Sequence, residues 1–164
     1  MGITFNADEV FEMAEQIERN GAKFYRQAAG NCPDAETKKM LFDMAAMEDE
    51  HLKTFQLMRR ELSGREKEMT TFDPDNEAAM YLQAVGDSRG WEGKISPALE
   101  LTGDDSIEQV LRAAVDAEKN SVVFYVALKE MVPARAGKDK VDDIIREEVG
   151  HLRLLYDRLS NLKD

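Results

Sequence analysis

Two short motifs place a carboxylate and an imidazole at a spacing that suits metal binding. Glu-x-x-His occurs at Glu48–His51 and again at Glu148–His151, and these are the only two histidines of the chain. Residues three positions apart in an α-helix lie about one turn apart on the same face, so both side chains can reach one ion. Two such motifs, with one further Glu from each of two other helices, form dinuclear carboxylate sites in four-helix bundles.

The second half of the chain repeats the first at an offset of 100 residues, and the repeat includes every candidate metal-binding residue. Four pairs of side chains that can bind or position a metal recur: Glu18 and Glu118, Glu48 and Glu148, His51 and His151, Tyr25 and Tyr125. Two helical hairpins related by a twofold axis would bring the four Glu and two His residues around one point. We predict that these six residues bind metal.

The chemistry of these six side chains indicates which metal they would hold. Four carboxylates carry about −4, which two divalent cations would neutralise on burial. Oxygen ligands with one imidazole per ion suit iron or manganese better than calcium or a thiolate zinc site. The ligand types therefore predict two ions and leave iron, manganese or a mixed pair open. Glu48 and Glu148 would bridge the ions, and Glu18 and Glu118 would each bind one.

The second motif contains an ambiguity, because Glu147 lies four positions before His151 and competes with Glu148 as the ligand. The counterpart of Glu147 in the first half is Met47, whereas Glu148 corresponds to Glu48. The repeat therefore favours Glu148.

Tyr25 and Tyr125 lie two turns beyond Glu18 and Glu118. They admit two interpretations, which are packing in the core or a hydrogen bond from each hydroxyl to a ligand carboxylate of the opposite hairpin. The second interpretation gives both tyrosines a part in orienting the ligands.

Four long helices must position these residues within a single domain, 1–164. Apolar residues at spacings of three and four predict helices over 7–29, 34–63, 106–131 and 138–162, with the candidate ligands at the centre of each apolar face. Gly30 is expected to end the first helix and Pro33 to begin the second. Residues 65–104, richer in Gly and Pro, are predicted to cross the length of the bundle and to include a short helix over 76–85.

Composition excludes several functional classes. The 164 residues carry 33 Asp and Glu against 22 Lys and Arg, a net charge of −11, which argues against nucleic acid or an anionic membrane as a partner. The first residues resemble neither a signal peptide nor a membrane span, and one cysteine cannot form an internal disulfide. We expect a cytoplasmic protein.

The pattern of Glu18, Tyr25, Glu48-x-x-His51 and its repeat resembles the ferritin-like superfamily, and most closely its rubrerythrin-type members. The resemblance covers all four predicted helices. It implies an all-α ferritin-like four-helix bundle with a long crossover between its second and third helices. It also implies a non-haem di-iron protein, with two iron ions, that oxidises ferrous iron or reduces hydrogen peroxide or dioxygen. A homodimer is expected.

Two departures from that family bear on function. The chain has one cysteine and no rubredoxin domain, so electrons must come from a separate donor such as a rubredoxin-like protein. Rubrerythrins also carry an extra Glu near the third-helix ligand, where this chain has Val115. A ferroxidase or iron-storage protein and a bundle with a purely structural metal site therefore stay open as alternatives.

Overall fold

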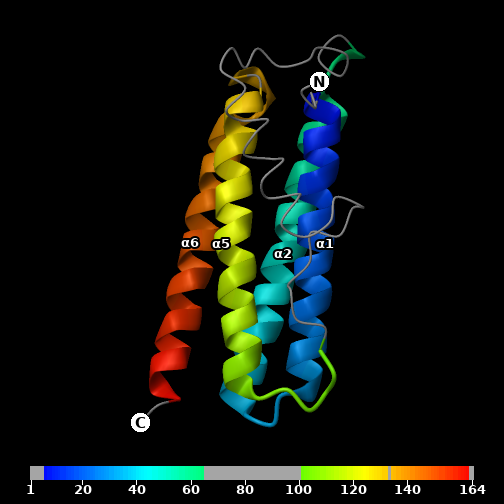
Figure 1. Ribbon diagram of the computed structural model, residues 1–164. Coiled ribbons are helices and arrows are strands. Elements are labelled where there is room, and N and C mark those ends of the chain that lie inside the picture. The colour runs from blue at the N-terminus through cyan, green and yellow to red at the C-terminus, as the bar shows by residue number, and fades with distance from the viewer. Residues whose placement is uncertain (1–5, 65–100, 133, 163–164) are drawn as a thin grey trace, which may run out of the picture.

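A computed structural model describes residues 6–64, 101–132 and 134–162, and it is an all-α bundle (Figure 1). Its elements are α1 (Ala7–Asn31), α2 (Ala35–Glu61), α5 (Ile107–Met131), the short 3₁₀ helix η1 (Ala134–Ala136) and α6 (Lys138–Asn161). No β-strand occurs among the elements of these described residues. The predicted fold class, an all-α four-helix bundle, is confirmed.

The helices form two antiparallel hairpins, α1 with α2 and α5 with α6 (Figure 1). α2 and α5 run in the same direction, so α2 ends and α5 begins at opposite ends of the bundle. Most of the predicted crossover and the whole predicted helix over 76–85 lie outside the described residues. None of the helices in the described part of the chain combines the length and apolar character needed to span a membrane.

Polar residues before the helices cap three of their N-termini. Asn6 and Ser106 form capping boxes with Glu9 and Gln109, as each side chain accepts a bond from the other residue's backbone N–H. Asp34 caps α2 by accepting the N–H of Thr37 at 2.7 Å. These caps pair backbone donors that have no partner within the helix.

The expected junction between the first two helices was wrong in detail. Gly30 lies inside α1, and Pro33 precedes the N-cap of α2 instead of opening the helix. Proline disfavours the α conformation in the preceding residue. Cys32 accordingly has an extended backbone, with φ −80° and ψ 121°, and α1 ends just before it.

The core consists of two apolar clusters at different heights of the bundle. The upper cluster, which includes Phe11, Phe55 and Tyr125, contains the start of α1 and the end of α2. The lower cluster, which includes Leu41 and Leu155, contains the end of α1 and the start of α2. The turns of helix between the clusters carry the buried polar residues described next.

Candidate metal centre

All six predicted ligands lie in one buried polar layer between the upper and lower clusters. Each is at most 4% exposed: Glu18, Glu48, His51, Glu118, Glu148 and His151. Each occupies the inward face of its helix because it falls in register with the apolar residues of that helix. Of the described residues, only Glu15 and Thr37 are further buried polar side chains. Glu15 pairs with Arg19 and Arg59, which takes it away from the layer.

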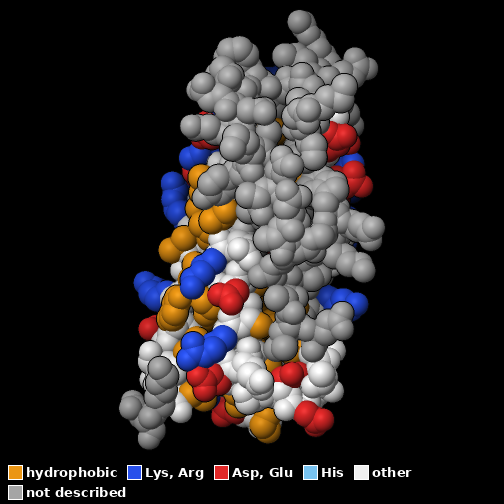
Figure 2. Space-filling model, viewed as in Figure 1, with side chains coloured by type: hydrophobic (Ala, Val, Ile, Leu, Met, Phe, Trp, Pro, Cys, Tyr) orange, Lys and Arg blue, Asp and Glu red, His pale blue; other side chains and the backbone are white. Residues whose placement is uncertain are grey.

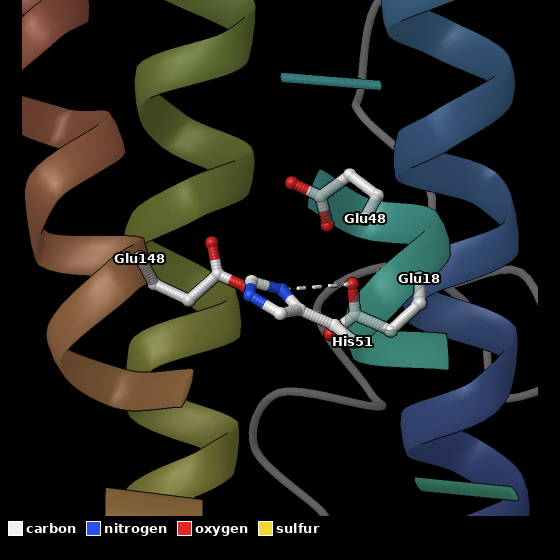
Figure 3. Close-up of side chains that lie close together, drawn as sticks. All are labelled: Glu18, Glu48, His51 and Glu148. Carbon is white, nitrogen blue, oxygen red and sulfur yellow. Dashed lines mark ion pairs between the residues drawn. The ribbon is translucent and has the colours of Figure 1, made fainter. Parts of the chain in front are cut away.

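The six side chains form two overlapping groups, each with ligand atoms within 4.8 Å of one another. One group contains Glu18 and His51, the other contains Glu118 and His151, and Glu48 and Glu148 belong to both. Figure 3 shows the first group, whose side chains point toward one another from α1, α2 and α6. The site therefore offers two adjacent positions for metal ions, and Glu48 and Glu148 could serve both of them.

Both imidazole rings turn the same nitrogen toward this layer. His51 Nδ1 lies 3.1 Å from Glu148 Oε1 and 3.6 Å from Glu18 Oε2, the pair drawn as a dashed line in Figure 3. His151 Nδ1 lies 2.9 Å from Glu148 Oε2 and 3.4 Å from oxygens of Glu48 and Glu118. Glu148 thus offers one carboxylate oxygen to each half of the site.

The packing of α1 against α2 leaves room for the other shared carboxylate. A Cβ atom at Gly21 would lie only 3.3 Å from Glu48 Oε2, which is tighter than most side-chain contacts. Glycine at this position therefore lets Glu48 extend across α1 toward the centre of the layer.

A tyrosine from each hairpin donates a hydrogen bond to the terminal carboxylate of the other hairpin. The Tyr25 hydroxyl donates to Glu118 Oε1, and the Tyr125 hydroxyl donates to Glu18 Oε1. Burial and the facing carboxylate raise the pKa of both phenols well above 10.0, so both remain protonated donors. The tyrosines therefore link the hairpins and fix the orientation of Glu18 and Glu118.

Three of the carboxyl groups hold protons more tightly than an exposed Glu does. Burial, together with the negative charge of Glu148, raises the pKa of Glu18 and Glu48 well above its usual value and that of Glu118 to about 8. Without a metal, this site is therefore partly protonated at neutral pH.

Glu148 and the two histidines behave differently. Burial would raise the pKa of Glu148, but its hydrogen bond with His151 and the nearby charge of the His51 ring bring it below its usual range. Burial would lower the histidine values, but Glu148 and the other nearby carboxylates raise the pKa of His51 to about 9 and that of His151 to about 10. An ionised Glu148 thus lies between two imidazolium rings in the metal-free protein.

The unpaired atoms of the layer fit a metal. Within the described residues, four buried side-chain atoms make no well-aligned hydrogen bond: Glu18 Oε2, Glu48 Oε1, His51 Nδ1 and Glu148 Oε1. Buried polar atoms without a partner destabilise a fold, and all four belong to the group drawn in Figure 3. A divalent cation would give each of them a partner, and these oxygen and imidazole donors suit iron or manganese.

The metal-free protein is expected to be less stable at pH 9 than at pH 6. The raised carboxyl and imidazole pKa values mean that the folded state binds more protons than the unfolded chain, whose values lie near 4.5 and 6.5. That stabilisation is lost as pH rises toward 9–10, whereas the opposite effect of Glu148 is confined to pH below about 4.5. Thermal unfolding in EDTA should give a Tm lower by about 5 °C or more at pH 9. A higher Tm at pH 9 would contradict these proton affinities.

Removal of one tyrosine hydroxyl is expected to weaken metal binding. Tyr25→Phe leaves the ring in the core but frees Glu118 to rotate, so affinity for a divalent cation should fall about 10–100-fold. Titration of the metal-free protein with Mn²⁺ or Co²⁺ would measure it. Tyr156→Phe is the matched control because Tyr156 is 47% exposed and lies outside the layer. Equal affinities of the two variants for the cation would mean that Tyr25 only packs in the core and does not orient Glu118.

Two residues near the histidines were not predicted to contact them. Glu147 was considered as a ligand of the second motif, but its side chain is 51% exposed and its Oε2 lies 2.9 Å from Nε2 of His51, on the other hairpin. Met47 Sδ lies 3.4 Å from Nε2 of His151. Both lie four positions before the histidine of their own helix, a spacing visible in the sequence, but their true partners are across the bundle.

Comparisons with known proteins agree with this architecture. A family model described as Rubrerythrin matches residues 9–160. A search of curated proteins found no match. Among solved structures, the chain is similar to a Thermotoga maritima protein described as a ferritin-like diiron-carboxylate protein, with a TM-score of 0.72 and 22% identity over 96% of each chain. At that identity the likeness shows that the two proteins share a fold.

Proposed function

The chain belongs to the rubrerythrin family, and from this premise we propose that it is a non-haem di-iron oxidoreductase that reduces hydrogen peroxide or dioxygen. The observation that supports this proposal is the buried layer in which two four-residue groups share Glu48 and Glu148. Bound there, two iron ions would supply the one-electron chemistry of the reaction.

The side chains would hold and orient the metals and keep bulk water out. Glu18 with His51, and Glu118 with His151, would each hold one ion, while Glu48 and Glu148 would hold both. The two tyrosine hydroxyls keep the terminal carboxylates in place. The apolar clusters above and below the layer exclude solvent, which strengthens the electrostatic interactions inside it.

The reaction needs an external source of electrons. Reduction of hydrogen peroxide to two water molecules takes two electrons and two protons, and reduction of dioxygen takes four of each. Cys32 is the single cysteine of the chain, so a four-cysteine iron site cannot form within it. We therefore assign the electrons to a separate, rubredoxin-like donor in the cytoplasm.

We also propose that the protein is a homodimer. Hydrophobic side chains are visible among charged ones along the α5–α6 side of the surface (Figure 2). Four of the large apolar residues that are 45–51% exposed belong to α5 and α6: Val126, Val149, Leu154 and Tyr156. A second copy would remove such side chains from water.

Rapid mixing of the protein with its oxidants tests the proposed reaction. Metal-free protein would be loaded anaerobically with two ferrous ions per chain and mixed separately with hydrogen peroxide and with dioxygen. Fast oxidation by peroxide and slow oxidation by dioxygen would support a peroxide reductase. Failure to bind two ions would exclude the di-iron proposal.

A ferroxidase or iron-storage function is the second candidate, and Val115 favours it. Val115 is 4% exposed and packs in the lower cluster, while the neighbouring acids Glu108 and Asp116 are exposed. Neither acid takes the place of the extra Glu found in rubrerythrins, so the ligands form a symmetric set of six. Fast oxidation by dioxygen, together with a mass in solution far above that of a dimer, would support storage. Unfolding on metal removal, with slow oxidation by both oxidants, would instead support a structural site.

A further inference from the structure

The two histidines differ at the ring nitrogen that faces away from the metal layer. Nε2 of His51 lies 2.9 Å from the Glu147 carboxylate, whereas Nε2 of His151 lies 3.4 Å from the Met47 sulfur. Met47 and Glu147 occupy equivalent positions of the 100-residue repeat. The internal symmetry of the site is therefore broken at this pair of contacts.

The difference affects how well each imidazole can bind a cation. With Nδ1 facing the carboxylates, Nε2 carries the proton when the ring binds metal. A carboxylate is a strong acceptor for that N–H, so Glu147 makes the ring of His51 a better electron donor and fixes its orientation. A thioether is a weak acceptor. Met47 therefore increases the electron-donating strength of the His151 ring less, and fixes its orientation less firmly.

We propose that the two metal positions are unequal, and that the position with His51 binds a divalent cation about 10–100-fold more tightly than the position with His151, because only the Nε2–H of His51 faces a carboxylate. The inference rests on the proposed function in one respect, namely that the six residues bind two ions. It adds that Glu147 is a positioning residue, which acts on the metal through His51.

The two positions have the same types of ligand, although their carboxylate oxygens lie at different distances from the two Nδ1 atoms, so the acceptor at Nε2 is the chemical difference between them. Both positions share Glu48 and Glu148, and each has one terminal Glu that accepts a bond from a tyrosine. The Glu147 side chain is half exposed, so water screens its charge, but the hydrogen bond itself still orients the ring.

Variants that each keep one histidine separate the two affinities. His151→Ala retains the His51 position, and His51→Ala retains the His151 position. Titration of each metal-free protein with Co²⁺, followed by its visible absorption, should give about 10–100-fold tighter binding for His151→Ala. Adding Glu147→Met to His151→Ala should remove most of that advantage. Adding Met47→Glu to His51→Ala should tighten binding by a similar factor.

A second measurement keeps all six ligands and does not depend on how well the single-histidine variants fold. In the Co²⁺-loaded protein, the two Nε2–H protons should give separate, strongly shifted proton NMR signals. Glu147→Met should speed solvent exchange of one signal and weaken overall Co²⁺ affinity about 10-fold or more. Glu50→Met is the matched control, because it removes one exposed carboxylate from α2 without touching a ligand.

The possible results separate this inference from the proposed function. The inequality would be supported if the protein binds two Co²⁺ ions and the two single-histidine variants bind Co²⁺ with unequal affinities. It also requires that Glu147→Met weakens binding while Glu50→Met does not. Equal affinities, or equal effects of Glu147→Met and Glu50→Met, would overturn the inequality and leave the dinuclear site intact. Absence of Co²⁺ binding by the unmodified protein would overturn both.

Discussion

The Glu148→Gln protein is expected to lose the second metal ion and, with it, the proposed reduction of peroxide or dioxygen. Glu148 belongs to both groups of ligands and offers one oxygen to each histidine. A carboxamide keeps the shape of the side chain but not its charge. Altering an outer partner of a metal ligand typically weakens affinity about 10–100-fold, so the loss of a shared ligand should weaken binding of the second ion at least about 100-fold. Calorimetric titration with Mn²⁺ would measure the stoichiometry.

The same substitution has a separate effect on the metal-free protein. Glu148 is ionised between two imidazolium rings, because the two rings lower its pKa. Removing one partner of a buried charge pair costs about 3–5 kcal/mol of stability. Burial raises the pKa of Glu48 and favours its protonated form, so Glu48→Gln should destabilise the metal-free protein less than Glu148→Gln does. Both variants should nevertheless bind metal poorly.

Urea unfolding at pH 7 in EDTA would compare the two variants, with Glu50→Gln as the control for loss of an exposed carboxylate. Equal destabilisation by Glu48→Gln and Glu148→Gln would mean that the ionised carboxylate has been assigned to the wrong residue. Normal binding of two ions by Glu148→Gln would contradict its place as a shared ligand.

Phe55→Ala is expected to destabilise the protein by about 3–5 kcal/mol, the usual range for removing a buried aromatic ring. The Phe55 side chain is fully buried, and its ring centre lies 5.1 Å from that of Tyr125 and 6.3 Å from that of Phe11. The cavity would also loosen Tyr125, which holds Glu18, so metal affinity should fall as well.

Thermal and urea unfolding of the metal-free protein would measure the change in stability. Leu57→Ala is the control on the same helix, since Leu57 is 48% exposed and should change stability by less than about 0.5 kcal/mol. Similar values for the two variants would mean that the upper cluster is not closely packed around Phe55.

The sequence by itself determined the helices and the six buried polar residues of the layer. Apolar residues at spacings of three and four define one face of each helix, and each of the six falls on that face. The 100-residue repeat then showed that the six belong together, and it distinguished Glu148 from Glu147. In the structure, Glu148 is fully buried while the Glu147 side chain is 51% exposed.

Only the tertiary structure decided which side chains meet across the bundle. Helical periodicity fixes the face on which a residue lies, but it does not fix the rotation and height of one helix against its neighbour. Met47 and Glu147 look like neighbours of their own motifs, yet each contacts the histidine of the other hairpin. Likewise, that Glu148 offers one oxygen to each histidine depends on how the α1–α2 and α5–α6 hairpins pack together.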